Sequence, residues 1–185
     1  MDGEPFSGRL LPGERIMWTG RPGQGVIFTA WDVFLIPFSL LWCGFAIFWE
    51  FMATAGVMAT GRSDVAFFPL FGLAFVCVGL YFVAGRFAVD ALMRRGIYYA
   101  VTDHRVLIRR SGPFGNFTAI GLDRLPDVRL SEGRAGRGTI RFGQAANPWR
   151  GFGGWSPTMD PTPQFLAIDN AKDVFDLIQR SEGRR

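Results

Sequence analysis

Two long apolar segments dominate the hydrophobic pattern of this chain. They cover residues 33–53 and 65–85, and each is 21 residues long. As a helix, a segment of this length extends ~31 Å, which matches the hydrocarbon thickness of a lipid bilayer. Backbone polar groups in lipid must be satisfied within the segment, so such a segment is helical. The pattern predicts two transmembrane helices, joined as an antiparallel hairpin by the short link 54–64.

Beyond Gly96 the helical periodicity gives way to the alternation that is typical of β-strands. Short strand-like segments follow one another, separated by turn residues: IYYAVT, RVLIRRS, FTAIGL, DVRLS, GTIRFG and QFLAID. Residues 170–181 then return to a helical pattern, with Ala171, Val174 and Ile178 on one face. The pattern predicts a small antiparallel sheet domain that is covered by a C-terminal helix.

The chain therefore divides into four predicted parts. They are an N-terminal segment with a short strand (1–32), a transmembrane hairpin (33–85), a cytoplasmic extension of the second helix (86–95) and a sheet domain (96–185). Residues 1–12 are rich in turn formers and are expected to be loosely held. Two antiparallel helices return the chain to its starting side, so Ile16 and Trp18 of the N-terminal strand are predicted to pack on the later sheet.

The distribution of arginine predicts how the hairpin is oriented. Residues 86–185 carry 16 basic and 10 acidic side chains, and the link carries a single arginine, Arg62. Arginines flank the hairpin on its other side, both before the first helix and after the second: Arg9, Arg15, Arg21, Arg86, Arg94 and Arg95. Because excess arginine marks the cytoplasmic side, both termini are predicted to be cytoplasmic, in a bacterial inner membrane.

The sequence offers few residues for catalysis. It has one histidine, His104, and two cysteines, Cys43 and Cys77, both within the apolar segments. It lacks clustered carboxylates and a phosphate-binding Gly-Lys-Ser/Thr loop, so no enzyme activity, metal, cofactor or small-molecule substrate is predicted. Anionic lipid explains the basic charge as well as nucleic acid does, and no nucleic-acid partner is predicted. Glu50 has two interpretations, as a proton or ion ligand or as an interfacial acid paired with Arg62.

Two groups of residues are candidates for contact with lipid or a partner. Arg94 and Arg95 follow the second helix, where anionic head groups would lie. Trp149, Arg150, Phe152 and Trp155 lie in the long Gly/Pro-rich stretch 143–163. Loops of this length are either functional or disordered. These aromatic residues are predicted either to touch a membrane or partner or to fold back on the sheet as a lid.

The clearest local motif is a β-hairpin. Residues 98–102 and 105–109 flank Asp103-His104, a two-residue hairpin turn for which Asp is a good first residue. Thr102, Asp103 and Arg105 are predicted to have structural roles in this hairpin, with Asp103 shaping the turn and Arg105 bonding to carbonyl groups or to Asp127.

The order of motifs resembles a known family. Leu11-Pro12-Gly13-Glu14, two membrane helices and then the hairpin sequence YAVTDHRVL (99–107) are together similar to the bacterial pleckstrin-homology-like (PH-like) membrane proteins. The resemblance implies an α+β membrane protein, in which the transmembrane hairpin precedes a PH-like antiparallel barrel or sandwich with a C-terminal capping helix. It does not imply phosphoinositide binding.

These observations lead to two functional expectations. The first is a non-enzymatic module, anchored in the inner membrane, whose PH-like domain binds a protein partner, itself or anionic lipid at the cytoplasmic face. The alternative is a subunit of a membrane transport or envelope-stress complex, in which the hairpin packs against other helices. Blue-native electrophoresis of the detergent-extracted protein distinguishes them, because the first gives one small species and the second a large discrete one.

Overall fold

The computed structural model describes residues 5–61, 67–112, 115–133, 136–144 and 156–182. Within it the chain forms two compact units. The helical unit comprises residues 26–89, and the sheet unit comprises residues 1–25 together with residues 90–185. The N-terminal segment thus belongs to the same folded unit as the C-terminal domain, although the whole helical unit separates them in the sequence.

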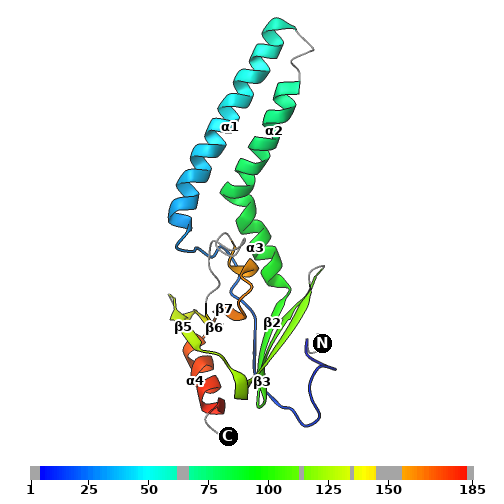
Figure 1. Ribbon diagram of the computed structural model, residues 1–185, viewed down its shortest axis with the longest axis vertical. Coiled ribbons are helices and arrows are strands. Elements are labelled where there is room, and N and C mark those ends of the chain that lie inside the picture. The colour runs from blue at the N-terminus through cyan, green and yellow to red at the C-terminus, as the bar shows by residue number, and fades with distance from the viewer. Residues whose placement is uncertain (1–4, 62–66, 113–114, 134–135, 145–155, 183–185) are drawn as a thin grey trace. The chain divides into compact units, whose positions relative to one another are not determined.

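The helical unit contains two long helices that lie side by side (Figure 1). They are formed by α1 (Asp32–Thr60), α2 (Phe67–Leu80), a π-helical turn (Tyr81–Gly85) and the first residues of α3 (Arg86–Arg95). Both helices are long and apolar enough to cross a membrane. The predicted link 54–64 is helical as far as Thr60, because α1 ends only where Gly61 adopts a left-handed conformation (φ 63°) and donates its N–H to the Val57 carbonyl.

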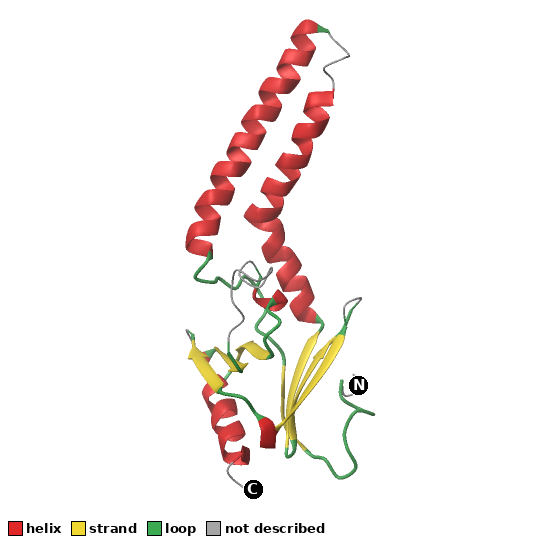
Figure 2. Cartoon of the chain, viewed as in Figure 1, coloured by secondary structure: helices red, strands yellow, loops and turns green. Residues whose placement is uncertain are grey.

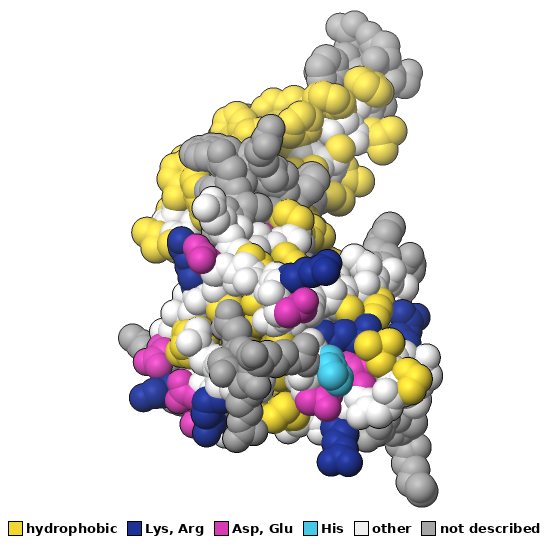
Figure 3. All heavy atoms as spheres, turned by 60° about the horizontal axis from the view of Figure 1, so that its bottom comes forward, with side chains coloured by type: hydrophobic (Ala, Val, Ile, Leu, Met, Phe, Trp, Pro, Cys, Tyr) yellow, Lys and Arg dark blue, Asp and Glu magenta, His cyan; other side chains and the backbone are white. Residues whose placement is uncertain are grey.

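Small residues let α1 and α2 approach closely at one point of their contact. The buried apolar or hydroxyl positions of α1 are Ser39, Cys43 and Ala46. On the facing helix, a side chain at Gly79 would lie only 3.0 Å from the Cα atom of Cys43, so the two backbones approach closely there. Many large apolar side chains of this unit are exposed, and hydrophobic side chains are visible along it in Figure 3.

The sheet unit contains two antiparallel sheets (Figure 2). The first has the order β1-β2-β3-β4, formed by Ile16–Gly20, Ile97–Thr102, Arg105–Arg110 and Asn116–Gly121. The second has the order β5-β6-β7, formed by Val128–Glu132, Gly138–Phe142 and Gln164–Ile168. The C-terminal helix α4 spans Ala171–Glu182 and buries Ala171, Val174 and Ile178. The predicted strands and the closing helix are confirmed.

The core lies between the two sheets and α4, and aromatic rings join its parts. The ring centroids of Tyr99 on β2 and Phe165 on β7 are 4.6 Å apart, and Phe142 on β6 meets Phe165 edge-on at 5.1 Å. The Tyr99 hydroxyl accepts a hydrogen bond from the Leu166 backbone N–H at 3.2 Å. Burial raises the pKa of Tyr99 to about 12, so this phenol stays neutral at physiological pH.

The expected PH-like barrel is not closed, because the described strands form two separate sheets. At the corner between β4 and β5, a 3₁₀ turn (Leu122–Arg124) and then Pro126 interrupt the strands. Proline has no N–H to donate, so it weakens ladder pairing at this point. On the opposite side, the chain after β1 approaches β7, and Gly23 donates its N–H to the Ala167 carbonyl at 3.0 Å.

The N-terminal strand packs on the later sheet, which confirms the sequence prediction. β1 pairs with β2, and Trp18 lies opposite Val101 in the ladder. The Trp18 ring faces the core, where its centroid is 5.5 Å from that of Phe165. A bulge between Ile16 and Trp18 turns Ile16 toward the outer face of the sheet.

The segment before β1 is more ordered than expected. Phe6 is fully buried against Ala100 and Leu107, which lie on the outer face of the first sheet. Residues 5–14, which we call the N-terminal strap, therefore cover that outer face. The prediction of a loosely held start was wrong for the strap, because a single large aromatic side chain outweighs the turn-rich composition around it.

We expect Trp18→Ala to destabilise the sheet unit by ~3 kcal/mol, because it removes a large ring from the core. Met17→Ala is the control, since Met17 precedes Trp18 on the same strand and is exposed. It should change the stability by about 0.5 kcal/mol or less. Denaturant unfolding and protease resistance of the full chain in nonionic detergent measure both effects. Equal stability of the two variants would contradict the packing of β1.

Candidate functional site

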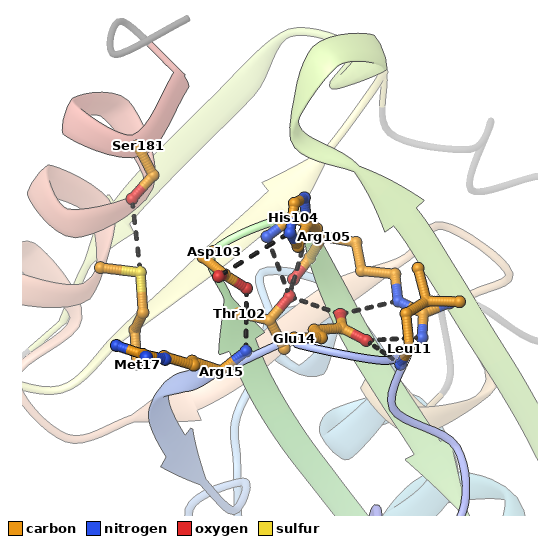
Figure 4. Close-up of polar contacts among 9 residues, drawn as sticks. All are labelled: Leu11, Glu14, Arg15, Met17, Thr102, Asp103, His104, Arg105 and Ser181. Atoms are coloured by element: carbon orange, nitrogen blue, oxygen red, sulfur yellow. Dashed lines mark hydrogen bonds and ion pairs between the residues drawn. The ribbon is translucent and has the colours of Figure 1, made fainter.

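A buried carboxylate joins the strap to the β2–β3 hairpin (Figure 4). Glu14 Oε1 accepts hydrogen bonds from the Thr102 hydroxyl at 2.7 Å and from Arg105 Nε at 2.9 Å. Its Oε2 accepts from Arg105 Nη2 at 2.9 Å and from the Leu11 N–H at 2.7 Å. The guanidinium thus grips both oxygens, which is the strongest geometry for an arginine–carboxylate pair.

These contacts change the acidity of Glu14. Burial by itself would raise the pKa of this carboxyl, but the hydrogen bonds from Arg105, Leu11 and Thr102 and the charge of Arg105 together lower it to about 2. Glu14 is therefore ionised throughout the physiological range. A carboxylate held in this way stabilises the folded state and has no proton to exchange near neutral pH.

Side-chain hydrogen bonds stabilise the turn between β2 and β3, whose backbone is not that of a type I′ turn. A type I′ turn needs positive φ at both central residues, and neither Asp103 nor His104 has it. The Thr102 hydroxyl instead accepts hydrogen bonds from the N–H groups of His104 and Arg105, at 3.2 and 2.9 Å. Asp103 Oδ1 accepts from the Arg15 N–H at 3.0 Å. Thr102, Asp103 and Arg105 all lie in this network, with their polar atoms directed toward the chain itself.

Two arginines of β3 hold the strap through its carbonyl groups. Arg105 Nη2 donates to the Arg9 carbonyl at 2.8 Å, and Arg109 Nη1 donates to the Pro5 carbonyl. The Arg9 guanidinium in turn lies over the Phe117 ring, 4.6 Å from its centroid. Together with the Glu14 ion pair, these contacts fix the strap at both of its ends.

A second charged network is built around the last two turns of α3. Arg94 is fully buried, and its Nε donates to Asp90 Oδ2 at 2.8 Å. Its other two nitrogens donate to the carbonyl groups of Gly23 and Gly25, in the segment that follows β1. The prediction that Arg94 contacts lipid or a partner is therefore corrected: its hydrogen-bonding groups are used inside the sheet unit.

Asp90 completes this network on the other side. Its Oδ1 accepts hydrogen bonds from the Ser156 hydroxyl and, at 3.2 Å, from the Thr158 N–H. Asp90 thus ties α3 to the short 3₁₀ turn Pro157–Met159, which precedes β7. The Asp90–Arg94 pair connects three segments that are far apart in the sequence.

Of the remaining candidate contact residues, the structure describes only Arg95. Arg95 is exposed, directly after the buried Arg94. Trp149, Arg150, Phe152 and Trp155 lie outside the described residues, so both interpretations of their loop stay open.

Glu50 is the acidic side chain that lies within the apolar part of the helical unit. Glu50 Oε2 is buried beside Gly72 and lacks a hydrogen-bond partner in the described part of the chain. The residue with which it was predicted to pair, Arg62, is outside that part. Cys43 and Cys77 are free thiols, and no cluster of three metal-ligating side chains occurs among the described residues.

Sequence reasoning missed two carboxylates, Glu14 and Asp90. Asp90 had a usable signal, since an acid four residues before an arginine on a helix predicts an ion pair. Glu14 had only its position in the Pro-Gly-Glu motif, and nothing local connects it to Arg105, which is far away in the sequence. Arg105 was accordingly assigned to carbonyl groups or Asp127, whereas it pairs with Glu14 and with the Arg9 carbonyl.

The family described as "Bacterial PH domain" matches residues 33–182. This range contains the two long helices apart from Asp32, the strands β2 to β7 and α4, and it begins after β1. No curated protein and no solved structure matches the chain.

We expect Glu14→Gln to flatten the pH dependence of stability. The pKa of Glu14 lies below its usual value, so its stabilising effect is complete above about pH 4.5 and is lost as the pH falls toward 2. The difference in unfolding free energy between the wild type and the variant should therefore shrink by about 3 kcal/mol over this range. Denaturant unfolding of the full chain at several pH values measures it. A constant difference would contradict the proposed role of the carboxylate.

We expect Arg94→Gln to destabilise the sheet unit by about 3 kcal/mol or more, because it leaves the buried Asp90 carboxylate without its ion-pair partner. Arg95→Gln is the matched control, with the same chemical change at the exposed neighbouring position. It should alter stability by about 0.5 kcal/mol or less. Thermal or denaturant unfolding of both variants tests this, and similar losses in the two would show that position 94 has no special role.

Proposed function

The chain belongs to the bacterial PH domain family, and we propose that it is a membrane-anchored, non-enzymatic member. The helical unit acts as the anchor. The sheet unit is the binding module at the cytoplasmic face of a bacterial inner membrane, where it binds a protein partner, a second copy of itself or anionic lipid. Members of this family generally mediate such binding.

The packing of the helical unit is the observation that carries the proposal. Small residues let α1 and α2 approach closely at Cys43 and Gly79, and Trp42 meets Phe75 across the pair, but many other large apolar side chains remain exposed. These exposed residues of α1 include Phe34, Leu41, Phe45, Phe48, Phe51 and Met58, each more than 60% exposed. A water-soluble helix pair would bury such side chains, whereas a pair surrounded by lipid leaves them outside.

The charged residues at the open end of this helix pair support the same proposal. Asp32 at the start of α1 and Arg86 at the start of α3 form a buried ion pair with a separation of 2.6 Å. Arg86 Nε also donates to the Phe82 carbonyl at 2.9 Å. Asp32 accepts from the Thr29 hydroxyl at 3.0 Å. The two charges are paired with each other, which lowers the cost of placing them next to a lipid-embedded segment.

The use of the buried charged residues favours binding over catalysis. Glu14, Asp32 and Asp90 are each held by an arginine in a fixed ion pair. A general acid or base needs a titratable group that is free to exchange a proton with a substrate. Among the described residues these carboxylates instead fix the strap, the end of the helix pair and α3.

Reporter fusions test the anchoring and its orientation. A reporter that works only in the cytoplasm should be active when it is fused after Arg185. A reporter that works only outside the cytoplasm should be active when it is inserted at Gly61. The reason is the excess of arginine on the side of both termini. Periplasmic activity of the C-terminal fusion would contradict the orientation, and recovery of the full chain in the soluble fraction would contradict the anchor.

A further inference from the structure

The sheet unit contains a basic hollow next to the contacts that hold the strap. It has a volume of about 440 Å³ and lies at the end of the first sheet where β3 turns into β4. Its lining includes three arginines and two small polar residues, together with one aromatic ring: Arg9, Arg109, Arg110, Ser111, Asn116 and Phe117. Among the described residues no acidic side chain lines it, so these lining residues carry a formal charge of +3.

The arginines come from two different elements that the fold brings together. Arg109 and Arg110 end β3, where they pair with Phe117 and Asn116 of β4. Arg9 comes from the N-terminal strap and is exposed, with its guanidinium over the Phe117 ring. None of the three forms an ion pair with a carboxylate among the residues that the structure describes. A bound anion would therefore reduce the electrostatic repulsion among the three guanidinium groups.

The rim of the hollow is hydrogen-bonded to the residue that precedes β2. The Ser111 N–H donates to the Gly96 carbonyl at 2.7 Å, and Gly96 directly follows α3. This hydrogen bond ties the rim of the hollow to the point at which the chain enters the sheet from α3.

We propose that this hollow binds a phosphate group, carried either by an anionic lipid head group or by a soluble phosphate compound. Guanidinium groups match the geometry and charge of phosphate oxygens, and arginine is the residue best suited to this contact. The hollow has the size of a compact head group. An acidic peptide is a poorer fit, because the aromatic ring that could anchor it is covered by Arg9.

Binding of defined probes to the full chain in nonionic detergent tests the proposal, whose lipid arm rests on the proposed function. The probes are inorganic phosphate, dihexanoylphosphatidylglycerol, dihexanoylphosphatidylcholine and a polyglutamate peptide. We expect the phosphatidylglycerol, inorganic phosphate or both to bind. Preference for the phosphatidylglycerol assigns the lipid source, and comparable binding of inorganic phosphate assigns a soluble one. Failure of both, or tighter binding of either of the other two probes, would overturn the proposal.

Two pairs of substitutions locate the binding. Arg9→Gln with Arg110→Gln removes two charges from the hollow and leaves Arg109 to hold the strap. It should weaken binding at least about tenfold. Arg124→Gln with Arg180→Gln removes the same charge from exposed positions outside the hollow and should change binding less than about threefold. Equal weakening by both pairs would show that only net charge matters and would overturn the site.

A third pair guards against misfolding. Arg9→Lys with Arg110→Lys keeps the charge and should retain more binding than the glutamine pair, with an unfolding midpoint close to that of the wild type. Loss of probe binding in all variants alike would count against the site. The reporter fusions do not depend on the hollow. If they show the expected topology but the probes do not bind, the phosphate site is overturned and the proposed anchoring is not.

Discussion

The antiparallel pairing of β1 with β2 determines where the helical unit can begin and end. Gly20 lies opposite Tyr99 in this ladder, and the whole helical unit is inserted between these two positions. Any excursion of the chain must therefore return to the neighbouring strand. Two antiparallel helices joined by a short link satisfy this constraint. If the inserted segment spans a membrane, the same constraint requires an even number of crossings. The sheet thus places both ends of the insertion on one side.

Buried charged groups extend this constraint beyond the strands. Arg94, near the end of α3, binds the carbonyl groups of Gly23 and Gly25, so the segment that leaves the sheet is tied to the segment that returns. Glu14 and Arg105 fix the other end of β1 against the β2–β3 hairpin. The two ion pairs act at opposite ends of β1. Each is costly to break, because a buried charge would be left without a partner.

Periodicity was enough to predict the strands and the helices, because apolar residues recur with the spacing of each element. The packing of β1 followed from the antiparallel hairpin, which returns the chain to its starting side. Periodicity could not predict the burial of Arg94, since the carbonyl groups of Gly23 and Gly25 that cover it lie far away in the sequence. Phe6 was missed for a similar reason, because one aromatic residue among turn formers has no period. The strands form separate sheets and not a closed barrel because the corner that contains Pro126 interrupts them. The hydrophobic pattern of the sequence does not distinguish these two arrangements.

Replacing residues 26–89 with a linker of about six glycine and serine residues tests most directly whether the helical unit is an insertion into one folded sheet unit. Such a linker is long enough, because Arg94 holds Gly25 close to the last turns of α3. The account predicts a water-soluble protein that unfolds cooperatively and shows hydrogen-exchange protection of the β1 and β2 amides. A protein that stays in the membrane fraction, or that is soluble but leaves β1 unprotected, would contradict it.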